Sequence, residues 1–261
     1  MSSKNNGRRP AVVGNWKMNG DIRANEKLLT AMRTTADRSQ IAASVDVAIC
    51  PAYPYIGQAS TWLGDTEVQW GAQDVCEHVN GAFTGAVSAM MLADLGCKFS
   101  LVGHSERRQL FGETDATVAQ KVARLFDADL SAIICVGETL EEREAGITES
   151  VLVRQIDAVS HVIKSARASR LMIAYEPVWA IGTGKTASPI EAQEAHLSIR
   201  TRLHECGVTF ADEIRILYGG SVKASNASEI FAMPDVDGGL VGGASLLAND
   251  FFAICRAAIP Q

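Results

Sequence analysis

Short apolar runs alternate with longer amphipathic stretches along most of the chain. Most of these runs are nearly continuous in apolar residues, which is typical of parallel strands that are covered on both faces. They predict eight strands, which begin near Ala11, Val45, Glu67, Lys98, Ser131, Leu171, Ile214 and Val236.

The stretches between the runs have the spacing of amphipathic helices. The stretch at 21–35 places four apolar side chains on roughly one stripe: Ile22, Leu28, Leu29 and Met32. A second helix is predicted from Ser188, with Pro189 at its first position and Glu191 closing a capping box. Its predicted apolar stripe consists of Ile190, Ala195, Leu197, Ile199 and Leu203.

Strand and helix alternate eight times without a linker or a break in composition. In a chain of 261 residues this pattern predicts a single (β/α)8 barrel over residues 11–261. An open, doubly wound sheet is the structural alternative. The polar residues 1–10 are expected to form a flexible tail.

Composition and charge narrow the class of protein. The chain is 47% hydrophobic and 21% charged, as globular proteins are, and its net charge of -6 argues against sequence-independent nucleic-acid binding. No stretch reaches the roughly 18 apolar residues of a membrane span. The N-terminus lacks the apolar core of a signal peptide, so a cytoplasmic protein is expected.

The six cysteines lie apart in the sequence, whereas a zinc site needs clustered ligands. We therefore expect reduced and mostly buried thiols, with no metal and no disulfide scaffold. These residues are Cys50, Cys76, Cys97, Cys135, Cys206 and Cys255.

Polar residues follow several of the predicted strands. Active sites of (β/α)8 barrels lie at the carboxyl ends of the strands, so these residues would meet on one rim. Each has a structural explanation when taken alone, such as a solvated charge, a helix cap or a tight turn. Together they are the candidate site: Asn15, Lys17, His104, Ser105, Glu106, Glu176, and the glycine-rich turns "GGS" and "VGG" after the seventh and eighth strands.

These residue types form a coherent chemical set. A carboxylate at the end of a buried strand becomes more basic when water is removed from it. An imidazole and an ammonium group can polarise a carbonyl and stabilise a developing oxyanion. Backbone N–H groups of glycine-rich turns can bind phosphate. The set indicates proton transfer next to the carbonyl of a small phosphorylated sugar, without a cofactor.

Two motifs resemble those of nucleotide-binding proteins and hydrolases, but each lacks a residue or a neighbouring element that the motif requires. "GTGKTA" from Gly182 resembles a dinucleotide fingerprint, yet "PVWAI" separates it from the preceding strand. Its "GKT" also resembles a P-loop, but Trp179 occupies the position of the first glycine. "GHSER" has Arg107 where the hydrolase elbow needs glycine.

Five motifs in order, "GNWKMNG", "GHSERR", "YEPVWAIGTGK", "YGGSVK" and "LVGGASL", resemble the triosephosphate isomerase family from about Val12 to Ile259. The resemblance implies a homodimeric barrel that interconverts dihydroxyacetone phosphate and glyceraldehyde 3-phosphate without a cofactor. A non-catalytic phosphosugar-binding barrel and an enzyme for a larger phosphosugar remain alternatives.

The resemblance also implies roles for individual residues. Glu176 matches the family's base, His104 its electrophile, Lys17 its electrostatic stabiliser, Asn15 a substrate contact and Glu106 a supporting acid. The base, the neutral histidine and the closing loop belong to the known mechanism of the family and are not deductions from this sequence. Four residues match positions whose backbone binds phosphate: Gly182, Ser221, Gly242 and Gly243.

By the same resemblance the residues after Glu176 form a lid. Its hinges would lie near Pro177 and at 184–185, and its tip at 180–182. A closed lid would exclude water from the base and keep the enediolate from losing phosphate.

The chain departs from the family where the dimer contact is expected. In the family, the residue matching Thr84 reaches the other subunit, and a glutamate pairs with the residue matching Arg107. Here Ala86 replaces that glutamate, and Asp74 stands where asparagine is usual. We hypothesise that Asp74 substitutes for the glutamate opposite the partner subunit's Arg107. The alternative is that Arg107 is solvated.

Overall fold

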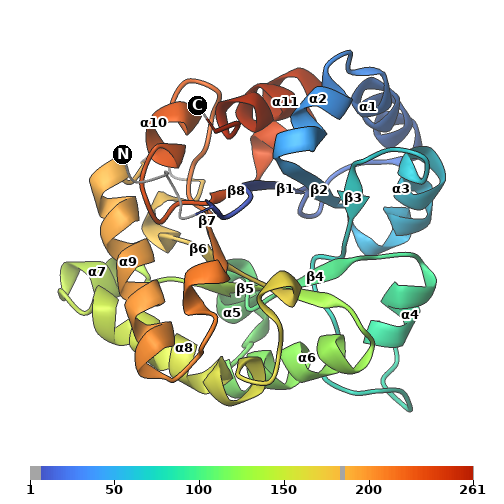
Figure 1. Ribbon diagram of the computed structural model, residues 1–261. Coiled ribbons are helices and arrows are strands. Elements are labelled where there is room, and N and C mark those ends of the chain that lie inside the picture. The colour runs from blue at the N-terminus through green and yellow to red at the C-terminus, as the bar shows by residue number, and fades with distance from the viewer. Residues whose placement is uncertain (1–6, 183–185, 261) are drawn as a thin grey trace.

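The computed structural model describes residues 7–182 and 186–260, and its strands form a ring that the helices surround (Figure 1). All eight predicted strands are present within these residues. They are β1 (Ala11–Asn15), β2 (Asp46–Cys50), β3 (Gln69–Trp70), β4 (Phe99–Val102), β5 (Ser131–Val136), β6 (Leu171–Tyr175), β7 (Arg215–Tyr218) and β8 (Gly238–Val241).

The strands pair in parallel in the order β3-β2-β1-β8-β7-β6-β5-β4. The first and last strands of this order are themselves linked, because Ala72 and Ser100 form a parallel bridge. The Ala72 N–H donates to the carbonyl of Phe99, and the Leu101 N–H donates to the carbonyl of Ala72. The sheet therefore closes on itself, so the prediction of a (β/α)8 barrel is confirmed and the open-sheet alternative is wrong.

Helices form the outer layer of the barrel (Figure 1). Those of the described residues are α1 (Ile22–Thr34), α2 (Arg38–Ser44), α3 (Ile56–Leu63), α4 (Ala89–Asp94), α5 (Ser105–Phe111), α6 (Asp115–Asp127), α7 (Leu140–Glu144), α8 (Thr148–Ile163), α9 (Pro189–Glu205), α10 (Ala227–Phe231) and α11 (Ala248–Ala257).

Two apolar layers explain why the strands read as continuous apolar runs. Side chains such as Val13, Leu101, Ile133 and Leu217 fill the inside of the barrel. The alternate strand residues, together with the inner faces of the helices, form a larger cluster between sheet and helices. Most strand residues are therefore removed from water on both faces of the sheet, which favours apolar residues; β3 is an exception, because Gln69 is exposed and Trp70 only partly buried.

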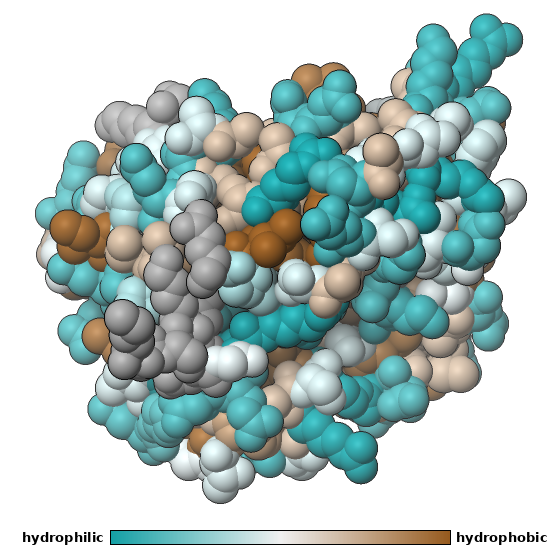
Figure 2. Space-filling view, turned by 45° about the horizontal axis from the view of Figure 1, so that its top comes forward, coloured by the Kyte–Doolittle hydropathy of each residue, from teal (hydrophilic) through white to brown (hydrophobic). Residues whose placement is uncertain are grey.

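On the face in Figure 2 the surface is mostly hydrophilic, and hydrophobic residues occur there in small separate groups. Cys50 and Cys135 are buried, as predicted, and so are Cys97 and Cys255. Burial raises the pKa of the Cys97 thiol to about 12. Within 7–182 and 186–260, no helix is long and apolar enough to cross a membrane.

The start of α9 was predicted correctly, but part of its buried face was not. Ser188 caps the helix and closes the capping box with Glu191. Ile190 and Leu197, however, are 66% and 51% exposed, whereas His196 and Arg200 are buried. The helix covers a cluster of ion pairs rather than a wholly apolar surface, so its inner face combines His196 and Arg200 with the predicted Ala195, Ile199 and Leu203.

In α1 the predicted stripe begins one turn too early. Leu29 and Met32 are buried, but Ile22 is 69% exposed and Asn25 is buried instead. Ile22 is the first residue of the helix, next to the capping residue Asp21, and lies at its end rather than against the barrel.

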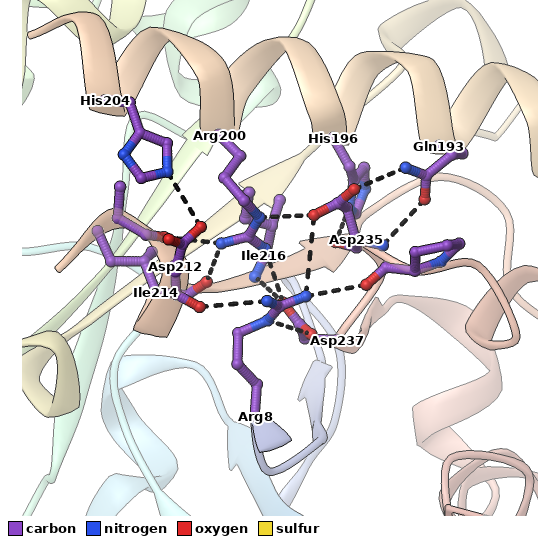
Figure 3. A network of polar contacts seen from close by, with 12 residues as sticks. Arg8, Gln193, His196, Arg200, His204, Asp212, Ile214, Ile216, Asp235 and Asp237 are labelled. Carbon is purple, nitrogen blue, oxygen red and sulfur yellow. Dashed lines mark hydrogen bonds and ion pairs between the residues drawn. The ribbon is translucent and has the colours of Figure 1, made fainter. Parts of the chain in front are cut away.

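Arg8 belongs to the ion-pair cluster beneath α9 (Figure 3). Its Nε donates to Asp237 Oδ1 at 2.8 Å, and its other nitrogens donate to the carbonyls of Asp212 and Pro234. Arg200 contacts the second oxygen of Asp237 at 3.3 Å. Arg8 and Pro10 are buried, so the end of the expected tail packs against the barrel from residue 8 onwards. Residues 1–6 lie outside the described part of the chain.

We predict that Arg8→Met lowers the free energy of unfolding by about 3 kcal/mol, because it leaves the fully buried Asp237 with one cation instead of two. Urea unfolding followed by circular dichroism measures this loss. Arg9→Met is the matched control, since Arg9 is about half-exposed and pairs with Asp46 at the surface; its cost should stay below about 1 kcal/mol. Equal losses of unfolding free energy in both variants would contradict a larger contribution of the buried Arg8–Asp237 pair than of the surface pair.

Candidate active site

The predicted rim residues line one cavity at the carboxyl ends of the strands. Its volume is about 540 Å³. The structure brings together in its walls eight of the predicted site residues: Asn15, Lys17, His104, Glu176, Gly182, Ser221, Gly242 and Gly243. Residues from four different strand ends and from the segment after β6 therefore converge on one space.

Lys17 is held in an unusual backbone conformation. Its φ is 53°, in the left-handed region that non-glycine residues rarely adopt. Three contacts fix it there: its N–H donates to Asn15 Oδ1 at 3.0 Å, its carbonyl accepts from Gln73 Nε2 at 2.8 Å, and its Nζ pairs with Glu106. These contacts offset a strain of about 1–3 kcal/mol and aim the ammonium group into the cavity. The sequence did not indicate a role for Gln73. Only its neighbour Asp74 was singled out, as a departure from the family at the expected dimer contact.

His104 follows β4 and caps α5. Its Nδ1 accepts a hydrogen bond from the Glu106 N–H at 3.2 Å. In a neutral imidazole the proton must then lie on Nε2, and this atom is 3.0 Å from Glu176 Oε1. The hydrogen-bonding pattern thus assigns the tautomer: Nε2 is the donor that faces the cavity.

Glu176 directly follows β6 and is only 2% exposed. Its Oε2 accepts from the Ser105 N–H at 2.8 Å, and its Oε1 faces the His104 Nε2. A buried carboxylate needs such donors, because an unpaired charge away from water is costly. Gly137 permits this arrangement: a Cβ at that position would come within 1.8 Å of the Glu176 carbonyl oxygen.

The glycine-rich turns after β7 and β8 face the same cavity. Gly242 and Gly243 open a short 3-10 helix, Gly243–Leu246, and a Cβ at Gly243 would meet no atom within 4 Å. Ser221 lines the same cavity and follows β7, the strand that pairs with β8. This arrangement leaves room for an anion beside backbone N–H groups.

The segment after Glu176 is anchored at both ends. A short 3-10 helix, Val178–Ala180, carries Trp179, whose Nε1 donates to Glu138 Oε1 at 2.7 Å. At the other end the Ala187 N–H donates to Tyr218 Oη at 3.3 Å. The predicted hinge at 184–185 lies outside the described residues.

Glu138 is a buried carboxylate that sequence reasoning missed. It lies two residues after β5, and both of its oxygens are 3.1 Å from the hydroxyl of Tyr175. Burial raises the pKa of its carboxyl, whereas the hydrogen bonds from Trp179 and Tyr175 lower it. Glu138 could have been found in the sequence as a polar residue that follows a strand, because the other polar residues of the site were found in that way.

The predicted dimer contacts lie outside the cavity, and two of them meet within one chain. Arg107 pairs with Asp74 at 2.8 Å and with Glu113 at 3.0 Å. Lys121 contacts the same two carboxylates at 2.7 and 3.2 Å. Arg107 is therefore paired by two carboxylates of its own chain rather than only solvated, whereas an Asp74 contact across subunits stays a prediction. Thr84 lies in an exposed loop.

Among the residues that the structure describes, no group of three or more His, Cys, Asp or Glu side chains could hold a metal ion.

Comparisons with known proteins agree with this geometry. A family model described as triosephosphate isomerase matches residues 10–258. Triosephosphate isomerases of Thiobacillus denitrificans and Herminiimonas arsenicoxydans are each 53% identical over 251 residues, covering 96% of this chain and 99% and 100% of theirs. The crystal structure of triosephosphate isomerase from Bartonella henselae is similar with a TM-score of 0.86 and 38% identity, covering 95% of this chain and 98% of that one. This chain belongs to the triosephosphate isomerase family.

Proposed function

We propose that the chain interconverts dihydroxyacetone phosphate and D-glyceraldehyde 3-phosphate by proton transfer through an enediolate. The observation that carries this proposal is the joint presence of Glu176, His104 and Lys17 in one cavity of about 540 Å³. That volume lies within the usual range for small-molecule sites and suits a triose phosphate.

Glu176 is the proposed base. It would take a proton from one substrate carbon and return it to the neighbouring carbon. Both of its oxygens are engaged by the Ser105 N–H and His104 Nε2, so the carboxylate has to leave these donors before it reaches a carbon.

His104 and Lys17 are the proposed stabilisers of the developing oxyanion. The Nε2–H of His104 faces the cavity and can donate to a substrate oxygen without carrying a charge. Lys17 adds a cation, and Asn15 both fixes the Lys17 backbone and offers a polar contact to the substrate. Glu106 holds the Lys17 ammonium and donates its own N–H to His104 Nδ1, so it supports both groups.

The phosphate is proposed to bind the backbone N–H groups of Gly182, Ser221, Gly242 and Gly243, which line the same cavity as Glu176, His104 and Lys17. Residues 177–185 are proposed to act as the lid over the bound substrate. Water exclusion by the lid would strengthen the electrostatic interactions inside and keep the enediolate from expelling phosphate.

A coupled assay tests the proposal, with D-glyceraldehyde 3-phosphate as substrate and dihydroxyacetone phosphate as the detected product. Isomerisation with kcat/KM above about 10⁴ M⁻¹ s⁻¹ is expected of an enzyme of ordinary efficiency. Phosphate binding without turnover would instead favour a non-catalytic phosphosugar-binding barrel. Turnover of a larger phosphosugar alone would favour the other alternative.

We further propose that the chain forms a homodimer through the loop that contains Thr84. The exposed apolar side chains in and after this loop support the proposal, because they gather in one segment and larger exposed apolar patches mark interaction sites. They are Val79, Phe83, Met90, Met91 and Leu95. Because Asp74 and Glu113 already neutralise Arg107 within one chain, the dimer does not need a glutamate at position 86.

Asp74→Asn is expected to shift the dimer–monomer midpoint about tenfold towards higher concentration. The change leaves Glu113 as one carboxylate between Arg107 and Lys121, so the cluster gains a net positive charge. Sedimentation velocity over a dilution series measures the midpoint, and activity should fall as monomer appears.

The double variant Asp74→Asn with Ala86→Glu should recover the midpoint, since it supplies a carboxylate from the loop near Thr84. Glu229→Gln, at an exposed position on α10 away from α4, is the matched control and should leave the midpoint unchanged (Figure 1). An unchanged midpoint in Asp74→Asn would contradict the link between this cluster and the dimer.

A further inference from the structure

The segment after Glu176 has two described flanks, and one side chain contacts both. The first flank is the short helix Val178–Ala180, and the second is the start of α9 at Ser188. Arg143, near the end of α7, lies between them.

On the first flank, the Arg143 guanidinium lies over the indole of Trp179, with its Cζ 4.1 Å from the ring centroid. The same indole donates its N–H to Glu138, and Arg143 approaches this buried carboxylate at 3.8 Å. The Val178 N–H also donates to the Glu138 carbonyl at 3.1 Å. Arg143 thus stacks on one face of a side chain whose edge is already fixed.

On the second flank, Arg143 pairs with Glu191. Glu191 also accepts from the Ser188 N–H at 2.7 Å and so forms part of the cap of α9. One guanidinium therefore joins the first turn after Glu176 to the first turn of the next helix. A planar guanidinium can stack and form forked ion pairs at once, which the ammonium group of lysine cannot do.

We propose that Arg143 is a positioning residue for the isomerisation. Its contacts set the relative position of the two flanks and thereby the position from which Glu176 acts. The inference rests on the proposed function, because its kinetic consequence is a loss of isomerase turnover. Glu176 directly precedes Pro177, so a shift of the first flank moves the carboxylate. A misplacement of about 1 Å can cost about a hundredfold in rate, and a partial loosening is expected to cost about tenfold.

The kinetic test is Arg143→Met, which keeps a long apolar stem but removes the stack and the ion pairs. We expect kcat to fall about tenfold while KM changes less than about threefold, because contacts to the substrate itself remain. Arg143→Lys should recover little, since it restores the charge without the planar fork. Arg202→Met is the matched control: Arg202 is 28% exposed against 32% for Arg143, and it pairs with Asp157 away from both flanks.

A spectroscopic test does not depend on activity. In protein labelled with 5-fluorotryptophan, the ¹⁹F resonance of Trp179 is identified by its absence in Trp179→Phe. Arg143→Met and Arg143→Lys should shift this resonance and leave those of Trp16, Trp62 and Trp70 in place. Arg202→Met should shift none of them. A wild-type Trp179 resonance in Arg143→Met would overturn the proposal, even if the isomerase assay had failed.

Glu191→Gln provides a second variant in case Arg143→Met does not fold. Glutamine still accepts the Ser188 N–H, so the capping box is kept while the ion pair with Arg143 is lost. A fall in kcat of about threefold or more at unchanged thermal stability supports the proposal. Wild-type kcat in both Glu191→Gln and Arg143→Lys would overturn it.

Discussion

Lys17→Met is expected to fold like the unchanged protein and to lose about a thousandfold in kcat. Removal of one group that stabilises a developing oxyanion costs about a hundredfold to a thousandfold, and here the lost group also carries a full charge. The backbone should not change, because methionine has the same steric limits as lysine at a φ of 53°. Glu106 loses its partner but is partly exposed, so water can solvate it.

Far-UV circular dichroism and the coupled assay on the same sample decide this prediction. Lys223→Met is the matched control, because Lys223 lines the same cavity without an assigned role. Its kcat should stay within about threefold of the original, since the effect of a rim charge is modest in water. Retained activity in Lys17→Met would show that Lys17 is only a solvated charge at the rim and does not stabilise the oxyanion.

Glu176→Asp should lower kcat about a hundredfold with little change in KM. The shorter side chain keeps the charge but draws the carboxylate back by about 1 Å, and proton transfer is sensitive to that distance. It also removes the carboxylate from the Ser105 N–H, which now accounts for one of its hydrogen bonds at 2.8 Å.

Steady-state kinetics in both directions measure the loss. Glu176→Gln is the comparison, because it keeps the length of the side chain and removes the basicity. It should be less active than Glu176→Asp. Near-normal turnover in Glu176→Asp would remove Glu176 from the role of base.

The sequence predicted most of the fold because its local signals agreed with the final packing. The eight strands were found from mostly apolar runs, and outside β3 such runs result from burial on both faces of the sheet. The cap of α9 was found because Ser188 and Glu191 act within one turn of helix. Each of these signals depends on residues that are close together in the sequence, so it can be recognised without knowledge of the tertiary structure.

The inner face of α9 could not be predicted by the same means. Periodicity assigns apolar residues to the interior, yet His196 and Arg200 are buried and Leu197 is exposed. The reason is an ion-pair cluster whose members come from distant parts of the chain: Arg8 contacts Asp237 across 229 residues. Only the closure of the barrel brings these charges together.

The sequence by itself determined the alternation of strands and helices, the residues that end the strands, and the family to which these motifs belong. The tertiary structure decided which groups those residues meet. It assigned the proton of His104 to Nε2, paired Arg107 with Asp74 of its own chain, and brought Gln73, Glu138 and Arg143 to the site. The physical reason is that hydrophobic burial follows local patterns, whereas hydrogen bonds and ion pairs depend on distances between side chains that are far apart in the sequence.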